Sequence, residues 1–283
     1  MNILSIQSWV AFGHVGNAAA MFPMQRLGVE VWAVNTVQFS NHTGYGKWRG
    51  QVFGPELVNE LVTGIEERGA LPTCAGVLSG YIGDAAIGQA VLDAVARVKH
   101  ANPNAIYCCD PVIGDVGRGV FVRPGIPEFF RDQALPLADL LTPNQFELEL
   151  LSGRKVATLE EAGEAADLVH AMGPKVILVT SLEDQAAPNG TIGVMVSDRG
   201  KRWLTRTPRL PISVNGAGDA VAALFMVHFA RTRDARVALE NAASSIFGLL
   251  RRTADAGSRE ILLVAAQDEF VNPTTRFTAQ PLD

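Results

Sequence analysis

The chain contains 283 residues, of which 48% are hydrophobic and 19% are charged, and its formal net charge at pH 7 is −5. This composition allows a large apolar core and excludes a disordered chain, and the dispersed basic residues exclude a nucleic-acid-binding surface. Apolar runs are shorter than the roughly 18 residues of a membrane span, and no basic signal-like segment begins the sequence. We therefore expect a cytoplasmic protein without a nucleic-acid or membrane partner.

The sequence predicts strands that alternate with helices in a single domain over residues 1–283, because no repeat or linker divides it. The expected strands are short apolar runs, and the expected helices repeat apolar residues at helical spacing. In chain order, the expected elements are a strand at 2–7, a helix at 15–28, a strand at 29–36, a helix at 55–69, a strand at 74–80, a helix at 84–101, strands at 104–111 and 138–144, helices at 145–153 and 158–173, strands at 175–181, 191–197 and 202–208, and helices at 217–232 and 234–252. Alternation of this kind predicts an α/β fold, in which a mostly parallel sheet carries helices on both faces.

The three cysteines, Cys74, Cys108 and Cys109, are predicted to be buried thiols. Their number is odd, none stands in C-x-x-C spacing, and two lie inside an apolar run. This pattern favours a reducing compartment over a disulfide framework.

Polar or glycine residues follow five of the expected strands. Ligands of such sheets bind beyond the carboxyl ends of the strands, so these positions predict one polar cleft along that edge. The five positions are Gln7-Ser8, Asn35-Thr36, Ser79-Gly80-Tyr81, Asp110-Pro111 and Thr142-Pro143-Asn144.

Two glycine-rich segments allow either a structural or a functional interpretation. "GHVGNAA" (13–19) is either a flexible turn or a place where backbone approaches a flat ligand closely. "NHTGYGKWRG" (41–50) is either a surface hairpin or a small lid that closes over substrate and excludes water.

An acidic group is expected beside the cleft. Asp110 ends a strand, and Asn144 and Glu147 stand three residues apart at a helix start, where they face the same way. Glu147 is either a first-turn charge that favours the helix dipole or, with Asp110, part of a site for hydrated Mg²⁺ over phosphates. The five histidines show no spacing typical of zinc ligands.

The stretch "SVNGAGDAVAALF" places Gly216-Ala217-Gly218 directly before Asp219 at the start of an expected helix. Asp219 is either a residue that favours the helix dipole or a general base beside a turn that binds a phosphoryl group. The sequence lacks a P-loop and has no G-x-G-x-x-G after its first strand. Taken with the acidic group, the stretch predicts phosphoryl transfer to a small hydroxyl compound.

These residues resemble the ribokinase-like superfamily, in which "NGAGDA" is similar to the anion-hole signature. Within it the chain resembles the pyridoxal kinase family, and most closely the bacterial pyridoxamine kinase branch usually called PdxY. The resemblance runs through nearly the whole chain and is carried by "SIQSWVAFGHVGNAAAMFPMQRLG", "NTVQFSNHTGYGKWRG", "LSGYIG", "CDPVIG" and "PNQFELE".

The resemblance implies an ATP-dependent kinase of the 5′-hydroxyl of pyridoxal, and of related B6 vitamers, that acts as a homodimer. Asp219 would deprotonate the hydroxyl beside an anion hole formed by Gly216, Ala217 and Gly218. The implied vitamer pocket comprises Ser8, Thr43, Gly44 and Tyr81.

The resemblance also implies a nucleotide side of the site. Its residues would bind the phosphates of ATP with Mg²⁺ and a monovalent cation such as K⁺, and Asp110, Thr142 and Glu147 would be the residues nearest the metal. The implied set is Asp110, Thr142, Asn144, Glu147, Thr180, Thr207, Pro208, Arg209 and Leu210.

Two positions depart from the family pattern. Thr180 stands where relatives often carry Lys, and Gly44 replaces a larger polar residue. Thr180 leaves open a weakly catalytic protein that binds pyridoxal phosphate. A second alternative is a hydroxymethylpyrimidine kinase, which shares the superfamily and also acts on a flat heteroaromatic alcohol.

Overall fold

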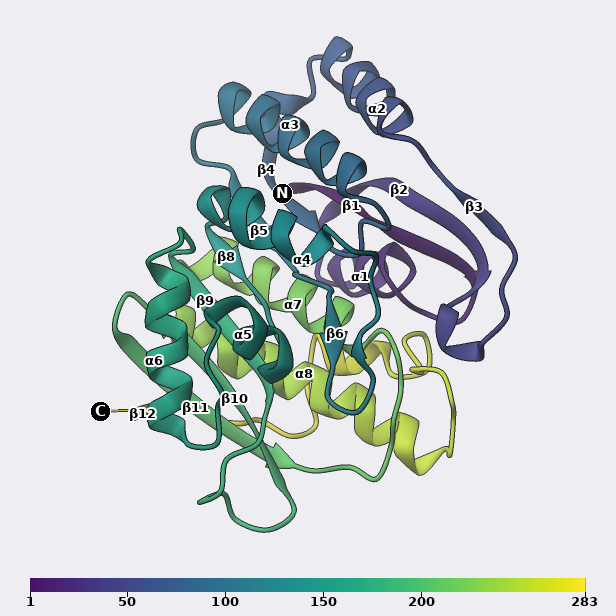
Figure 1. Ribbon diagram of the computed structural model, residues 1–283. Coiled ribbons are helices and arrows are strands. Elements are labelled where there is room, and N and C mark those ends of the chain that lie inside the picture. The colour runs from purple at the N-terminus through teal and green to yellow at the C-terminus, as the bar shows by residue number, and fades with distance from the viewer. Residues whose placement is uncertain (283) are drawn as a thin grey trace.

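The computed structural model describes residues 1–282, and a ten-stranded sheet runs through its centre (Figure 1). The strand order is β12-β11-β10-β9-β8-β5-β4-β1-β2-β3, and the six strands from β9 to β2 are mutually parallel. The expected α/β class is therefore confirmed. The sheet contains β1 (Asn2–Phe12), β2 (Glu30–Asn41), β3 (Gly50–Val52), β4 (Cys74–Ser79), β5 (Ile106–Cys109), β8 (Leu140–Leu141), β9 (Val176–Leu182), β10 (Thr191–Asp198), β11 (Lys201–Pro208) and β12 (Gln280–Leu282).

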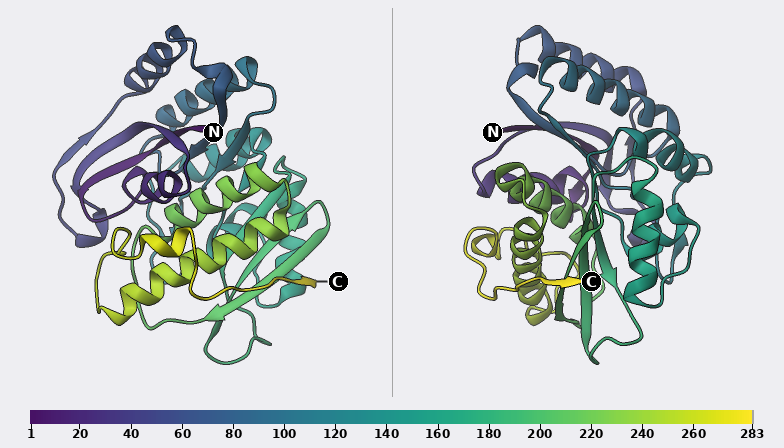
Figure 2. Two further views of the ribbon diagram at one scale, coloured as in Figure 1. Left: turned by 180° about the vertical axis from the view of Figure 1, so that it is seen from behind. Right: turned by 90° about the vertical axis from the view of Figure 1, so that its left-hand side faces the viewer.

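Helices cover both faces of the sheet and bury one apolar core on each. Figure 2 shows α7 and α8 on one face and α5 and α6 on the other. One core joins α1, α7 and α8, and the other joins α2 to α6, so that the parallel strands are buried on both sides. The helices are α1 (Asn17–Arg26), α2 (Pro55–Glu67), α3 (Ala85–Ala101), α4 (Ile126–Phe129), α5 (Gln145–Ser152), α6 (Leu159–His170), α7 (Ala217–Thr232) and α8 (Ala235–Asp255).

The first two strands are longer than the sequence predicts. The expected ends at Gln7 and Thr36 are wrong, because β1 and β2 stay paired as far as Phe12 and Asn41. Pairing of β1 with β4 stops at Ile6, and the register of β1 with β2 shifts just after Gln7. The two strands therefore extend beyond the sheet. There β2 pairs antiparallel with β3 and forms, with the helical turn Thr43–Tyr45, a small hairpin that we call the lid.

Residues 112–138 form more structure than the sequence predicts. The glycine-rich stretch folds into a hairpin of β6 (Gly114–Asp115) and β7 (Gly119–Val120), and helical turns follow from Ile126 to Leu137. The strand expected at 138–144 has only two residues in the sheet, Leu140 and Leu141. Strands of two residues carry too little alternation to be recognised in a sequence.

The three cysteines are buried and free, as predicted. Burial raises the pKa of the Cys109 thiol to about 12, so this thiol stays protonated. Within residues 1–282, no helix is long and apolar enough to cross a membrane.

The half-buried ring of His228, in α7, predicts a loss of stability in acid. Burial, with the charge of Arg231, lowers the pKa of His228 to about 4, whereas the unfolded chain has a pKa near about 6.5. The unfolded state therefore binds the proton first, and the free energy of unfolding falls as the pH drops from about 6.5 to about 4. We expect His228→Gln to reduce the loss between pH 7 and pH 5 by about 1–2 kcal/mol, measured by urea unfolding. If both proteins lost the same free energy of unfolding between pH 7 and pH 5, His228 would not cause the loss.

Candidate active site

The residues predicted to bind ligand follow neighbouring strands at one edge of the sheet (Figure 1). Tyr81, Asp110 and Thr142 follow the carboxyl ends of β4, β5 and β8, and Thr180 lies near the end of β9. Ser8 lies in β1 where its pairing with β4 ends. The structure therefore confirms that this edge of the sheet collects polar residues, although two strands continue past it.

The glycines of the turn before α1 allow protein segments to approach one another. Gly16 has φ +56°, and a Cβ there would clash with the carbonyl oxygen and Oγ of Ser8. The backbone N–H of Gly16 also lowers the pKa of Asp219, which burial raises more strongly. The turn thus joins Ser8, which is 6% exposed, to Asp219.

Two of the three carboxyl groups of the site, those of Asp110 and Glu147, are buried, and that of Asp219 is half-buried. Burial, followed by the charges of Asp219 and Glu147, raises the pKa of Asp110 well above its usual range. Burial also raises the pKa of Glu147 to about 8, against the effect of backbone N–H donors. Thr142 Oγ1 donates to Asp110 Oδ1 at 2.9 Å. Negative charges that raise the pKa of a buried acid favour a cation or a proton in the site.

Asn144 and Glu147 face the same object, as the sequence predicts, and that object is the backbone at Ile113 and Gly114. Glu147 Oε1 accepts from the N–H groups of Ile113 at 2.9 Å and Gly114 at 3.3 Å, and Oε2 accepts from Asn144 N at 3.0 Å. Asn144 Oδ1 accepts from Glu147 N at 2.9 Å, which completes a capping box on α5. Glu147 therefore has a structural role, and its role as a metal ligand stays a prediction.

The turn before α7 leaves open space at the helix start. Gly216 has φ +86°, and a Cβ there would clash with the carbonyl oxygen of His14. A Cβ on Gly218 would meet no atom within 4 Å. The first N–H groups of α7 lack intrahelical partners and attract anions. Asp219 lies in this first turn, so the geometry suits either interpretation of the residue.

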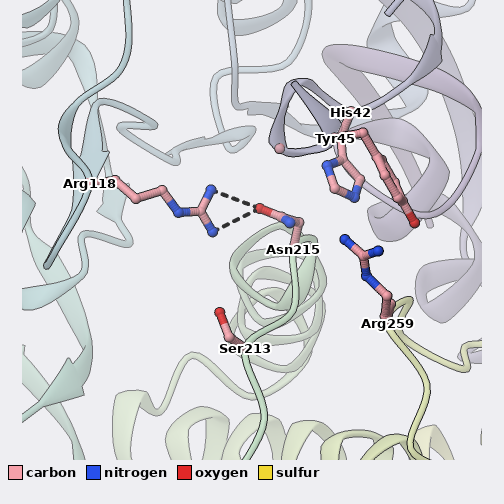
Figure 3. A pocket seen from close by; sticks show the side chains of 7 residues that line it. His42, Tyr45, Arg118, Ser213, Asn215 and Arg259 are labelled. Atoms are coloured by element: carbon pink, nitrogen blue, oxygen red, sulfur yellow. Dashed lines mark hydrogen bonds between the residues drawn. The ribbon is translucent and has the colours of Figure 1, made fainter. Parts of the chain in front are cut away.

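A cavity of about 300 Å³ lies between the lid and this turn (Figure 3). Arg118, from the β6–β7 hairpin, donates through both Nη atoms to Asn215 Oδ1 at 3.1 Å. A Cβ on Gly44 would lie 3.2 Å from Asn215 Nδ2, so the lid contacts the segment before α7. Of the lining residues, Gly44 was predicted, and four others lie within the two stretches that the sequence singles out, 41–50 and 213–225. Arg118 and Arg259 lie outside both stretches, and no local signal points to them. The lining comprises His42, Gly44, Tyr45, Arg118, Ser213, Asn215 and Arg259.

The residues predicted to face the nucleotide lie at the same edge of the sheet, near the ends of β9 and β11. Thr180 N donates to the carbonyl of Pro143 at 2.9 Å, beside the start of α5. Thr207 to Leu210 end β11, where Arg209 forms an ion pair with Glu183 at 2.7 Å. Their role in binding ATP stays a prediction.

The donor set fits a hard cation with few protein ligands. In the part of the chain that the structure describes, no three His, Cys, Asp or Glu side chains converge as a complete metal site does. Mg²⁺ uses one or two carboxylates with water and phosphate oxygens, so Asp110 and the Thr142 hydroxyl suit it.

A parallel sheet with buried carboxylates and a glycine-rich helix start at its carboxyl edge, beneath a lid, suits a kinase of small molecules. Residues 73–263 match the family model described as phosphomethylpyrimidine kinase. The chain is 62% identical to pyridoxal kinase PdxY of Granulibacter bethesdensis and covers 99% of both sequences. It is 57% identical to pyridoxal kinase PdxY of Rubrobacter xylanophilus, over 98% of this chain and 96% of that one. The chain therefore belongs to the pyridoxal kinase family.

Solved structures agree with this assignment. The pyridoxal kinase of Leishmania donovani in complex with ADP and pyridoxamine superposes with a TM-score of 0.93 at 32% identity, over 100% of this chain and 99% of that one. The pyridoxal kinase of Trypanosoma brucei gives a TM-score of 0.87 at 29% identity, over 99% of both chains. The family resemblance and the ribokinase-like fold are confirmed.

Proposed function

We propose that the protein transfers the γ-phosphoryl group of ATP to the 5′-hydroxyl of pyridoxal, and of related vitamers, in vitamin B6 salvage. Relatives that match along the whole chain are named pyridoxal kinases, and the Leishmania donovani enzyme binds ADP with pyridoxamine. The observation that carries the proposal is the place of Asp219, a half-buried acid in the first turn of α7 that accepts from the backbone of Gly16.

In this reaction Asp219 takes the proton of the 5′-hydroxyl as its oxygen bonds to the γ-phosphorus. The bond from that phosphorus to the bridging oxygen of ATP breaks, and ADP leaves with the electron pair. The N–H groups at Gly216, Ala217 and Gly218 stabilise the charge on the phosphoryl oxygens. The raised pKa of Asp219 makes it a stronger base than an exposed aspartate.

The vitamer would lie between the β1 strand and the lid. Ser8 would hydrogen-bond its ring, while Thr43 and Gly44 in the lid and Tyr81 after β4 would complete the pocket. Closure of the lid would exclude water from the reacting phosphoryl group.

The nucleotide would bind along the β5–β11 side of the edge with Mg²⁺ and a monovalent cation such as K⁺. Mg²⁺ held near Asp110, Thr142 and Glu147 would neutralise phosphate charge. Further contacts with the nucleotide would come from Asn144, Thr180, Thr207, Pro208, Arg209 and Leu210. We also propose a cytoplasmic homodimer.

An assay of ADP release with ATP, Mg²⁺ and K⁺ tests the proposal. Pyridoxal, pyridoxamine, pyridoxine and hydroxymethylpyrimidine are offered separately, and we expect turnover on pyridoxal. Turnover on hydroxymethylpyrimidine alone would make the chain a hydroxymethylpyrimidine kinase. Tight binding of pyridoxal phosphate without turnover on any substrate would make it a binding protein.

A further inference from the structure

The carboxylate of Glu260 joins two loops that are distant from it in sequence. Tyr45 Oη donates to Glu260 Oε1 at 2.6 Å, and His42 Nε2 lies 3.0 Å from the same oxygen. The backbone N–H of His14 donates to Oε2 at 3.1 Å. The Glu260 side chain is only 15% exposed, so water competes little for these bonds.

The residues around Glu260 leave room for its side chain. Gly13 has φ +84°, and a Cβ there would clash with the Glu260 carboxylate. The guanidinium carbon of Arg259 lies 5.1 Å from the centroid of the Tyr45 ring, and Figure 3 shows Arg259 pointing toward Tyr45. The hydrogen bond to Glu260 is the main cause that raises the pKa of Tyr45, so the hydroxyl remains a donor.

Both loops that Glu260 joins contact the site. His42 and Tyr45 flank Thr43 and Gly44, the two lid residues of the vitamer pocket. His14 contacts Gly216 through its carbonyl oxygen, so the same residue that donates to Glu260 also supports the turn before α7. A carboxylate with three partners therefore sets the distance between the lid and the start of α7.

We propose that Glu260 is a positioning residue that docks the lid against the Gly13–His14 turn and so determines affinity for the vitamer, leaving ATP affinity unchanged. The second half of this inference rests on the proposed function, whereas the docking of the lid does not. The nucleotide side extends from β5 across β8 and β9 to β11, and none of its predicted residues contacts Glu260 among the hydrogen bonds of residues 1–282.

The first test compares Glu260→Gln with the wild-type protein. Glutamine keeps the size of the side chain but turns an NH₂ group toward one of three donors. We expect the KM for pyridoxal to rise about tenfold, as loss of one or two hydrogen bonds does, and the KM for ATP to stay within about twofold. Tyr45→Phe should raise the KM for pyridoxal as well, and the double variant should show less than the sum of the two effects.

Glu269→Gln is the matched control. Glu269 is a buried glutamate in the same C-terminal segment, with Arg252 Nε at 3.0 Å and Thr274 N at 2.8 Å, and it has no contact with the lid. We expect Glu269→Gln to lower Tm and to leave the KM for pyridoxal unchanged. A Glu260→Gln protein that raises both KM values alike and loses Tm as Glu269→Gln does would overturn the proposal.

Hydrogen exchange of the ligand-free proteins tests the docking without any substrate. We expect backbone amides of residues 42–46 to exchange faster in Glu260→Gln than in wild type, with residues 85–101 unchanged. This result would support the docking even if the wild-type protein proved inactive on pyridoxal. Unchanged exchange at residues 42–46 would overturn the docking even in an active kinase.

Discussion

Asp219→Asn should lose about 10²–10⁴-fold in kcat, because the amide cannot take the proton of the attacking hydroxyl. The fold should remain, since Asn has the same size and burial already disfavours the charged form of Asp219. The pKa of Asp219 is higher in the folded than in the unfolded protein, so its ionisation removes stability as the pH rises above about 4. The variant should therefore be at least as stable as wild type at pH 8. An assay of ADP release measures kcat, and urea unfolding measures the free energy of unfolding.

Asp255→Asn, at the exposed end of α8, is the control and should retain full turnover. A kcat of Asp219→Asn within about tenfold of wild type would show that another group takes the proton. Loss of turnover together with a lower free energy of unfolding would instead assign Asp219 a structural role at the start of α7.

Glu147→Ala should reduce the free energy of unfolding by about 3–5 kcal/mol, because it removes the acceptor of three N–H groups, two of them buried. At pH 7, below its pKa of about 8, Glu147 is largely protonated, so its removal relieves little charge burial. Urea unfolding at pH 7 without Mg²⁺ measures the effect.

Glu161→Ala in α6 is a matched comparison, because Thr158 and Glu161 form the same kind of capping box there. Glu161 is exposed, so water can replace it, and we expect a loss of only about 1 kcal/mol. Similar losses in the two variants would refute the idea that Glu147 fixes the Ile113–Gly114 backbone. If Glu147→Ala abolishes Mg²⁺-dependent turnover yet unfolds normally, Glu147 acts mainly at the metal.

The predicted elements with clear local signals agree closely with the structure. The helix expected at 217–232 is α7, and Thr158, where another helix was expected to begin, is the N-cap of α6. The strands expected at 191–197 and 202–208 are β10 and β11, which pair antiparallel. Each of these follows from periodicity, caps or turn residues within a few positions of one another, and such signals survive folding because local hydrogen bonds satisfy them.

The errors concern polar residues inside strands. Asn35 was expected to end β2, but its Oδ1 accepts from Asn17 Nδ2 at 2.9 Å, and the strand continues. Gln7 also lies inside a strand, but its amide donates to Ser5 Oγ at 3.0 Å within that same strand, β1. A polar residue indicates a strand end only if no partner from another segment satisfies it, and the sequence does not name that partner.

The sequence by itself determined the α/β alternation, the acids at strand ends, and the Gly216-Ala217-Gly218-Asp219 turn, because each depends on neighbours along the chain. Only the tertiary structure decided that Glu147 holds the backbone of Ile113 and that Glu260 joins the lid to the turn before α1. Glu260 lies 215 residues from Tyr45 and belongs to no local pattern. Such contacts form when packing brings distant segments together, because a carboxylate that is shielded from water is stable only if those segments donate hydrogen bonds to it.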